Sequence, residues 1–166
     1  SWFEGKNSTK HPAMFRRLGV SAAQDTAAVQ AMFDSANPGD TLLLSGTLQW
    51  EGSANVGILG NRSYLGARLL NKTGITVNCT GSKNYTTTIN THTFSIEGSS
   101  NIKVTGVGEW YPYSWSQINA AQAPSEWNPP PGGSGASAIQ FPTIIAFESS
   151  NVEIERQRIY KSVGPS

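Results

Sequence analysis

Apolar residues recur at helical spacing in one stretch of the chain, residues 25–36. Four of them fall at i, i+3, i+4 and i+7 and would share one face of a helix: Val29, Met32, Phe33 and Ala36. Asp25 belongs to the residue types that favour the N-cap position, and the Asn-Pro-Gly-Asp sequence at 37–40 supplies turn chemistry at the other end. The pattern predicts a single amphipathic helix that starts at Asp25 and ends near Ala36.

Beyond residue 40 the pattern changes to short β-segments. Residues 41–45 and 47–50 are rich in Thr and Leu and are bounded by glycines, which is typical of strands. The first 20 residues show no clear periodicity. We therefore divide the chain into an N-terminal arm (residues 1–20) and a second part (residues 21–166) that holds the helix and the strands.

A repeated unit follows, in which a turn residue precedes an apolar, a polar and an apolar residue. Its three copies are Gly74-Ile75-Thr76-Val77, Asn101-Ile102-Lys103-Val104 and Asn151-Val152-Glu153-Ile154. A Ser-Ser pair comes before each of the last two copies. Residues 94–97 also match residues 145–148 when a one-residue gap is placed at Gly98. Repetition of this kind indicates an architecture of stacked units.

The distances between the copies constrain that architecture. From residue 75 to residue 102 is 27 positions, a natural length for one coil of a β-helix, whereas from 102 to 152 is 50. The longer interval suits two coils or one coil with an insertion. We favour an insertion, because residues 109–137 contain five prolines and a Gly-Gly-Ser-Gly sequence and read as a loop.

Stacked parallel strands would place the apolar residues of each copy in rows inside the coil. Ile102 and Val104 would then lie over Val152 and Ile154, and polar residues such as Lys103 would face solvent. One coil cannot bury its own apolar side, so several coils and a cap are needed. We predict an all-β fold, a parallel β-helix of few coils, with the helix at residues 25–36 as its N-terminal cap.

The segments that carry a family resemblance are Gly19-Val20, residues 24–33 (QDTAAVQAMF) and residues 38–44 (PGDTLLL). They resemble the N-terminal signature of the pectate-lyase-like β-helix superfamily, which includes polygalacturonases, pectate lyases and bacteriophage tailspike depolymerases. The likeness covers residues 19–46, and the Ser149-to-Ile154 segment looks like a coil unit of the same group. Gln24 stands where many members have an Asp.

The resemblance implies a right-handed β-helix and a protein that binds and cleaves polysaccharide, as a glycoside hydrolase or a polysaccharide lyase. It also implies an extracellular location, secreted or on a virion surface, a possible homotrimer as in tailspikes, and further coils beyond those seen here. The Asn-Thr-Asp, Gly-His-Gly and Arg-x-Lys segments of polygalacturonases are absent from this sequence. The alternative is a non-catalytic glycan-binding, adhesive or structural β-helix segment.

Glycoside hydrolysis commonly uses two carboxylates at a defined separation. Two pairs are candidates: Glu153 with Glu155, which flank Ile154 and should point the same way, and Glu97 with Glu148, which would stack one coil apart if the repeat alignment holds. The alternative, which we favour for all four, is a solvated surface position without a catalytic role.

The predicted loop is unusually aromatic, with five Trp or Tyr residues in 18 positions: Trp110, Tyr111, Tyr113, Trp115 and Trp127. Flat rings stack on the apolar faces of sugars, and Tyr hydroxyl and Trp N–H groups add polar contacts. These residues are our candidates for substrate binding. The alternative is that the loop packs against the β-helix or another subunit.

Composition and sequence length patterns argue against several other classes of protein. The net charge is +1 and only 14% of residues are charged, which argues against a nucleic-acid-binding protein. No apolar run reaches the length of a transmembrane helix, and no signal peptide is visible at the N-terminus. We expect no cofactor and no metal site. Cys79 is the single cysteine and is predicted to be buried and unreactive.

Overall fold

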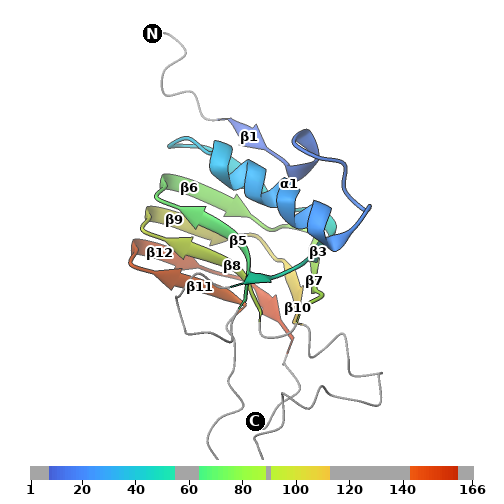
Figure 1. Cartoon of the computed structure of the whole chain (residues 1–166). Coiled ribbons are helices and arrows are strands. Elements are labelled where there is room, and N and C mark those ends of the chain that lie inside the picture. Colours follow the sequence, from blue (N-terminus) through green and yellow to red (C-terminus); the bar gives the residue numbers. More distant parts are fainter. Residues whose placement is uncertain (1–7, 55–63, 89–90, 113–142, 161–166) are drawn as a thin grey trace, which may run out of the picture.

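The computed structural model describes residues 8–54, 64–88, 91–112 and 143–160. Within these residues the chain forms one α-helix and a series of short strands, most of which run parallel to their neighbours (Figure 1). In chain order the elements are β1 (Thr9–Lys10), a 3-10 turn (Pro12–Met14), α1 (Ala22–Ser35), β2 (Thr41–Leu43), β3 (Gly46–Trp50), β4 (Ser53–Ala54), β5 (Tyr64–Leu70), β6 (Thr73–Asn78), β7 (Ser82–Thr86), β8 (Thr91–Glu97), β9 (Ser100–Thr105), β10 (Glu109–Tyr111), β11 (Ile144–Phe147), β12 (Ser150–Ile154) and β13 (Arg158–Ile159).

The strands form three sheets that the chain visits in rotation. Sheet A has the order β1-β2-β6-β9-β12, sheet B the order β13-β10-β7-β3, and sheet C the order β11-β8-β5-β4. Every strand pair is parallel except β4 with β5. From β5 onward each passage runs from sheet C to sheet A to sheet B, and the next passage stacks on it. This topology is compatible with a parallel β-helix-like fold.

The three copies of the sequence repeat stack directly on one another in sheet A. Ile75 pairs with Ile102, which pairs with Val152, and the row of Val77, Val104 and Ile154 follows the same order. The predicted stacking is therefore confirmed. The apolar side chains of the first two copies are buried, because alternate residues of a strand face the interior.

The 50-residue interval holds one passage and an insertion, as predicted, since β12 pairs directly with β9. The insertion begins later than we predicted, however. Residues 109–111 are strand β10 and not loop, because this segment pairs with β7 (Trp110 with Asn84, Tyr111 with Tyr85). Residues 113–137 of the predicted loop lie outside the described residues.

Helix α1 lies across one end of the three sheets (Figure 1). Its predicted apolar face is confirmed, since Val29, Met32, Phe33 and Ala36 are all buried. The rings of Phe33 and Phe94 form an edge-to-face pair with centroids 5.6 Å apart. The predicted start is wrong by three residues. The N-cap is Ser21, whose hydroxyl accepts the N–H of Gln24 at 3.1 Å.

Polar side chains of α1 satisfy the outer edges of sheets B and C. Asp25 accepts the N–H of Gln49 at 3.0 Å, and the hydroxyl of Thr26 accepts the N–H of Glu51 at 2.8 Å. Asp25 therefore binds the edge of β3 and does not serve as the N-cap. An unprotected strand edge can pair with another chain, so α1 closes this end of the sheets as the sequence predicted for a cap.

The end of the Asn-Pro-Gly-Asp turn holds the N-terminal arm against sheet A. Asp40 is almost fully buried and accepts hydrogen bonds from the hydroxyl and N–H of Ser8 and from the N–H of Asn37. Its carboxylate also lies 3.1 Å from Nζ of Lys10. Part of the predicted arm is consequently strand, because Thr9 and Lys10 pair with β2.

We expect acid to release this arm. Burial alone would raise the pKa of Asp40, but the hydrogen bonds from Asn37, Lys10 and Ser8 outweigh it and lower the pKa from 3.8 to about 2. A depressed carboxyl pKa stabilises the fold fully above pH 3.8, and the contribution is lost as the pH falls towards 2. Asp40→Asn should lower the free energy of unfolding by about 2 kcal/mol at pH 7 and flatten its dependence on pH between 4 and 2. Urea unfolding at several pH values measures both effects, and an unchanged acid dependence in Asp40→Asn would contradict the assignment.

Candidate functional site

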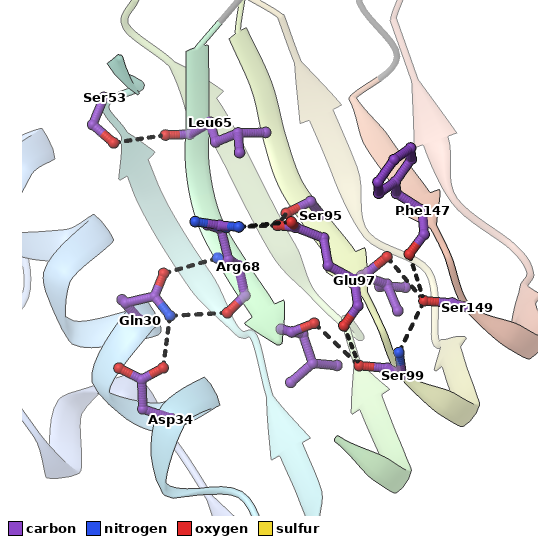
Figure 2. A network of polar contacts seen from close by, with 12 residues as sticks. Gln30, Asp34, Ser53, Leu65, Arg68, Ser95, Glu97, Ser99, Phe147 and Ser149 are labelled. Atoms are coloured by element: carbon purple, nitrogen blue, oxygen red, sulfur yellow. Dashed lines mark hydrogen bonds and ion pairs between the residues drawn. The ribbon is translucent and has the colours of Figure 1, made fainter. Parts of the chain in front are cut away.

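Glu97, the first of the catalytic candidates, is held in a nearly buried ion pair on sheet C (Figure 2). Arg68 donates from Nε to one carboxylate oxygen at 2.6 Å and from Nη2 to the other at 2.7 Å. Ser95 adds a third hydrogen bond at 2.7 Å. The bonds from Arg68 lower the pKa of Glu97, against the opposing effect of burial. A general acid needs a raised pKa, so this carboxylate is suited to a structural role.

The same network ties sheet C to helix α1. Gln30 pairs with the backbone of Arg68 in both directions, accepting its N–H at 2.8 Å and donating to its carbonyl at 2.9 Å. Nε2 of Gln30 also donates to Asp34 at 2.9 Å. In Figure 2 these residues lead from the helix to the Arg68–Glu97 pair. The primary amide of Gln30 thus replaces a neighbouring strand at the edge of β5.

Glu148 does not stack on Glu97. In the register of β8 and β11, Phe147 lies beside Glu97, and Ile144 lies beside Phe94. The predicted alignment of residues 94–97 with 145–148 is therefore wrong by one residue. Glu148 occupies the turn between sheets C and A. Asn71 and Gly98 hold the equivalent position in the two preceding passages, directly after strands β5 and β8. All three residues have positive φ.

This turn position strains Glu148. Its φ is +47°, a left-handed conformation that costs a residue with a Cβ roughly 1 kcal/mol or more. We expect Glu148→Gly to raise the free energy of unfolding by about 0.5–1 kcal/mol. Gly98→Ala should act in the opposite direction, because a Cβ at this position would collide with the side-chain oxygen of Asn71. Urea unfolding of both variants tests the pair, and a destabilised Glu148→Gly would contradict the strain argument.

Glu153 and Glu155 lie at the outer end of sheet A. Glu153 is exposed in β12, beside Lys103. Glu155 accepts the hydroxyl hydrogen of Thr105 at 2.9 Å and lies 3.6 Å from Nζ of Lys103. The Thr105 hydroxyl and then the charge of Lys103 lower the pKa of Glu155. An ionised carboxylate of this kind can act as a base or nucleophile, but not as the proton donor.

The five aromatic candidates do not share one surface. Trp110 is fully buried: its ring packs 5.9 Å from Trp50 and 5.6 Å from Phe94, and its N–H donates to Gln157 at 2.8 Å. Its place in the interior follows from strand alternation in β10, so the expectation that Trp110 offers its ring to a sugar is wrong. Tyr111 points the other way, onto the outer surface of sheet B. Three candidates lie outside the described residues: Tyr113, Trp115 and Trp127.

Tyr111 is the middle member of a column of three tyrosines. Its ring stacks on Tyr85 at 4.7 Å and on Tyr160 at 4.5 Å, with the planes within 8° of parallel. Its hydroxyl donates to Glu109 at 2.8 Å. This bond raises the pKa of Tyr111, so the phenol stays a neutral donor at physiological pH.

A row of alternating charge runs beside the tyrosines. Glu109 pairs in register with Lys83 on one side and Arg158 on the other. We call these two rows together the sheet B surface: Lys83, Tyr85, Glu109, Tyr111, Arg158 and Tyr160. The sequence analysis missed Tyr85 and Tyr160. A signal was present, because Lys-Asn-Tyr (83–85), Glu-Trp-Tyr (109–111) and Arg-Ile-Tyr (158–160) share a charged residue, an inward residue and a tyrosine.

Three further expectations concern metals, membranes and Cys79. Among the described residues no three His, Cys, Asp or Glu side chains are grouped closely enough to hold a metal ion. No helix in the described part of the chain is long and apolar enough to cross a membrane. Cys79 is buried, as predicted, and burial raises the pKa of its thiol to about 12, which favours the thiol over the reactive thiolate.

Comparisons with known proteins add no relative from which a function could be transferred: no family model matches the chain, and no curated protein or solved structure matches it.

Proposed function

We propose that the chain is the capped N-terminal portion of a right-handed parallel β-helix protein that acts on polysaccharide outside the cell, and that the sheet B surface holds the glycan. Three sheets visited in rotation and a helix over one end support the architecture. The hand follows the general preference of parallel crossover connections. The resemblance of residues 19–46 to the pectate-lyase-like superfamily supports the class of substrate.

The binding proposal rests on the two rows of side chains on sheet B, one of tyrosines and one of charged residues. Sugars offer hydroxyl groups that both donate and accept hydrogen bonds. The two rows present phenol, ammonium, guanidinium and carboxylate groups, and neighbouring groups in a row are one strand apart. Lys83 and Arg158 also offer positive charge to the carboxylates of acidic sugars. The tyrosine rings stack on one another, so they contribute their edges and hydroxyl groups.

The binding proposal predicts a selective loss of glycan retention. Lys83→Ala with Arg158→Ala should weaken retention of acidic polysaccharide in affinity electrophoresis by about tenfold, the loss of one or two hydrogen bonds to charged groups. The matched control is Lys103→Ala, an exposed lysine on sheet A, which should leave retention unchanged. Equal retention by the double variant and the control would refute the role of the sheet B surface.

Cleavage is the second candidate function, and the positions of Glu153 and Glu155 at the outer end of sheet A favour it. Because the pKa of Glu155 is lowered, Glu155 would serve as base or nucleophile and Glu153 as the exposed partner. Glu153→Gln and Glu155→Gln should each abolish release of reducing ends or unsaturated products if cleavage occurs on this chain. Intact turnover in both variants would refute the catalytic assignment of Glu153 and Glu155.

A further inference from the structure

The charged row on sheet B has a regular order along the stack of strands. In the strand order β13-β10-β7-β3, the row runs from Arg158 to Glu109 to Lys83, and Thr47 follows in register with Lys83. A cation therefore stands on every second strand, and the strands between them carry a carboxylate or an uncharged side chain. Neighbouring strands lie about 4.8 Å apart, so the two strands that carry the cations are separated by about 10 Å.

The two cations of the row are open to a ligand. Lys83 and Arg158 are both exposed, and the ion pairs within the described part of the chain join other residues. An anion can therefore approach either cation without displacing a salt bridge. Opposite charges on neighbouring strands can stabilise a sheet by pairing with each other. Because Glu109 forms no ion pair with Lys83 or Arg158, such pairing does not account for the order of the row.

Glu109 is held in place more firmly than the cations on either side of it. Its side chain is half-buried, and its Oε2 accepts the hydroxyl hydrogen of Tyr111 at 2.8 Å. Its backbone carbonyl accepts a hydrogen bond from Nδ2 of the buried Asn84 at 3.1 Å. Lysine and arginine, by contrast, have long side chains with many rotamers. A ligand on this surface must therefore fit the carboxylate of Glu109 where it stands.

We propose that the sheet B surface selects glycans that carry an acidic group on every second sugar, an inference that rests on the proposed function. One pyranose unit of an extended chain is about as long as the spacing of two strands, so a glycan along the rows places one sugar on each strand. Acidic sugars then face Lys83 and Arg158, and the neutral sugar between them donates a hydroxyl hydrogen to Glu109. A glycan with a carboxylate on every sugar brings one of them against Glu109, and this repulsion disfavours it.

Affinity electrophoresis of the 166-residue chain in two polymers tests the spacing of the acidic groups. Hyaluronan alternates an acidic sugar with a neutral one, whereas polygalacturonate has a carboxylate on every sugar. At equal carboxylate concentration we expect hyaluronan to retain the chain about fivefold more strongly, the upper end of what an exposed charge pair contributes. Glu109→Gln should abolish this preference by strengthening retention in polygalacturonate. Glu109→Lys makes the row cationic on three successive strands and should reverse the preference.

The matched control is Glu148→Gln, which changes the net charge by the same amount in the turn between sheets C and A. It should keep the preference of the unmodified chain, and circular dichroism checks that every variant is folded. Equal retention in both polymers, stronger retention in polygalacturonate, or a hyaluronan preference that both Glu109 variants keep would overturn the selectivity. Glycan binding would then still stand, provided that Lys83→Ala with Arg158→Ala weakens retention. Retention in neither polymer, or undiminished retention of that double variant, would overturn the proposed function and the selectivity together.

Discussion

Replacing Arg68 by alanine is expected to lower the free energy of unfolding by about 3 kcal/mol, the lower end of the range for breaking a buried ion pair. The reason is the position of Glu97, whose side chain is only 7% exposed while that of Arg68 is 32% exposed. Without the guanidinium, the carboxylate keeps Ser95 as a partner but loses two charge-assisted hydrogen bonds. Urea unfolding at pH 7 measures the loss.

Two variants identify its cause. Adding Glu97→Gln to Arg68→Ala should recover part of the loss, because the uncompensated charge is then removed. Lys103→Ala breaks the exposed pair with Glu155, whose side chains are 49% and 43% exposed, and should cost at most about 1 kcal/mol. If Arg68→Ala cost no more than Lys103→Ala, the Arg68–Glu97 pair would contribute no more than an ordinary surface contact.

The stacked architecture could be predicted from sequence because its main determinant is local. Inward and outward residues alternate along a strand, so Ile102 and Val104 are recognisable as a pair wherever the unit recurs. A repeat of 27 positions then places Ile75 and Val77 above them. The later interval of 50 positions could be interpreted as one passage with an insertion because proline cannot donate to a strand ladder.

The error at the start of the helix arises because a residue satisfies distant backbone groups. Asp25 resembles an N-cap in sequence, but its carboxylate is used by Gln49 and by the N–H of Gly19, which accounts for its burial inside the first turn of α1. The one-residue error at Glu148 has a different origin. A glutamate is a poor match for a glycine in sequence, yet Glu148 and Gly98 share the same left-handed turn position.

The candidate site was only partly predictable. The sequence selected Tyr111 and Trp110 together because both are aromatic, but neighbouring residues of a strand face opposite sides of a sheet. The tyrosine column requires the register of three strands from separate passages, and only the charged-x-tyrosine pattern carries that information in sequence. Glu153 and Glu155 were correctly expected at the surface, whereas the partners of Glu155, Thr105 and Lys103, come from the preceding passage.

Trp110→Ala is expected to lower the free energy of unfolding by about 3–5 kcal/mol, the usual cost of removing a large aromatic side chain from a core. The indole fills the interior between Trp50 of sheet B and Phe94 of sheet C, so its removal leaves a cavity between these two sheets. Trp110→Phe should cost less, because a ring remains and the loss is limited to part of the ring volume and the hydrogen bond to Gln157. Urea unfolding followed by tryptophan fluorescence and circular dichroism measures both.

The neighbouring residue supplies the matched control. Tyr111 is half-buried on the outer surface, so Tyr111→Ala should cost less than half as much stability as Trp110→Ala and should weaken glycan retention. Trp110→Phe should leave retention unchanged, since its ring lies behind the sheet. The opposite result, a stable Trp110→Ala variant that no longer retains glycan, would put the indole on the surface and reverse the assignment of inner and outer faces in β10. Because the register of β7 and β13 on β10 fixes the same faces, it would also remove the tyrosine column on which the binding proposal rests.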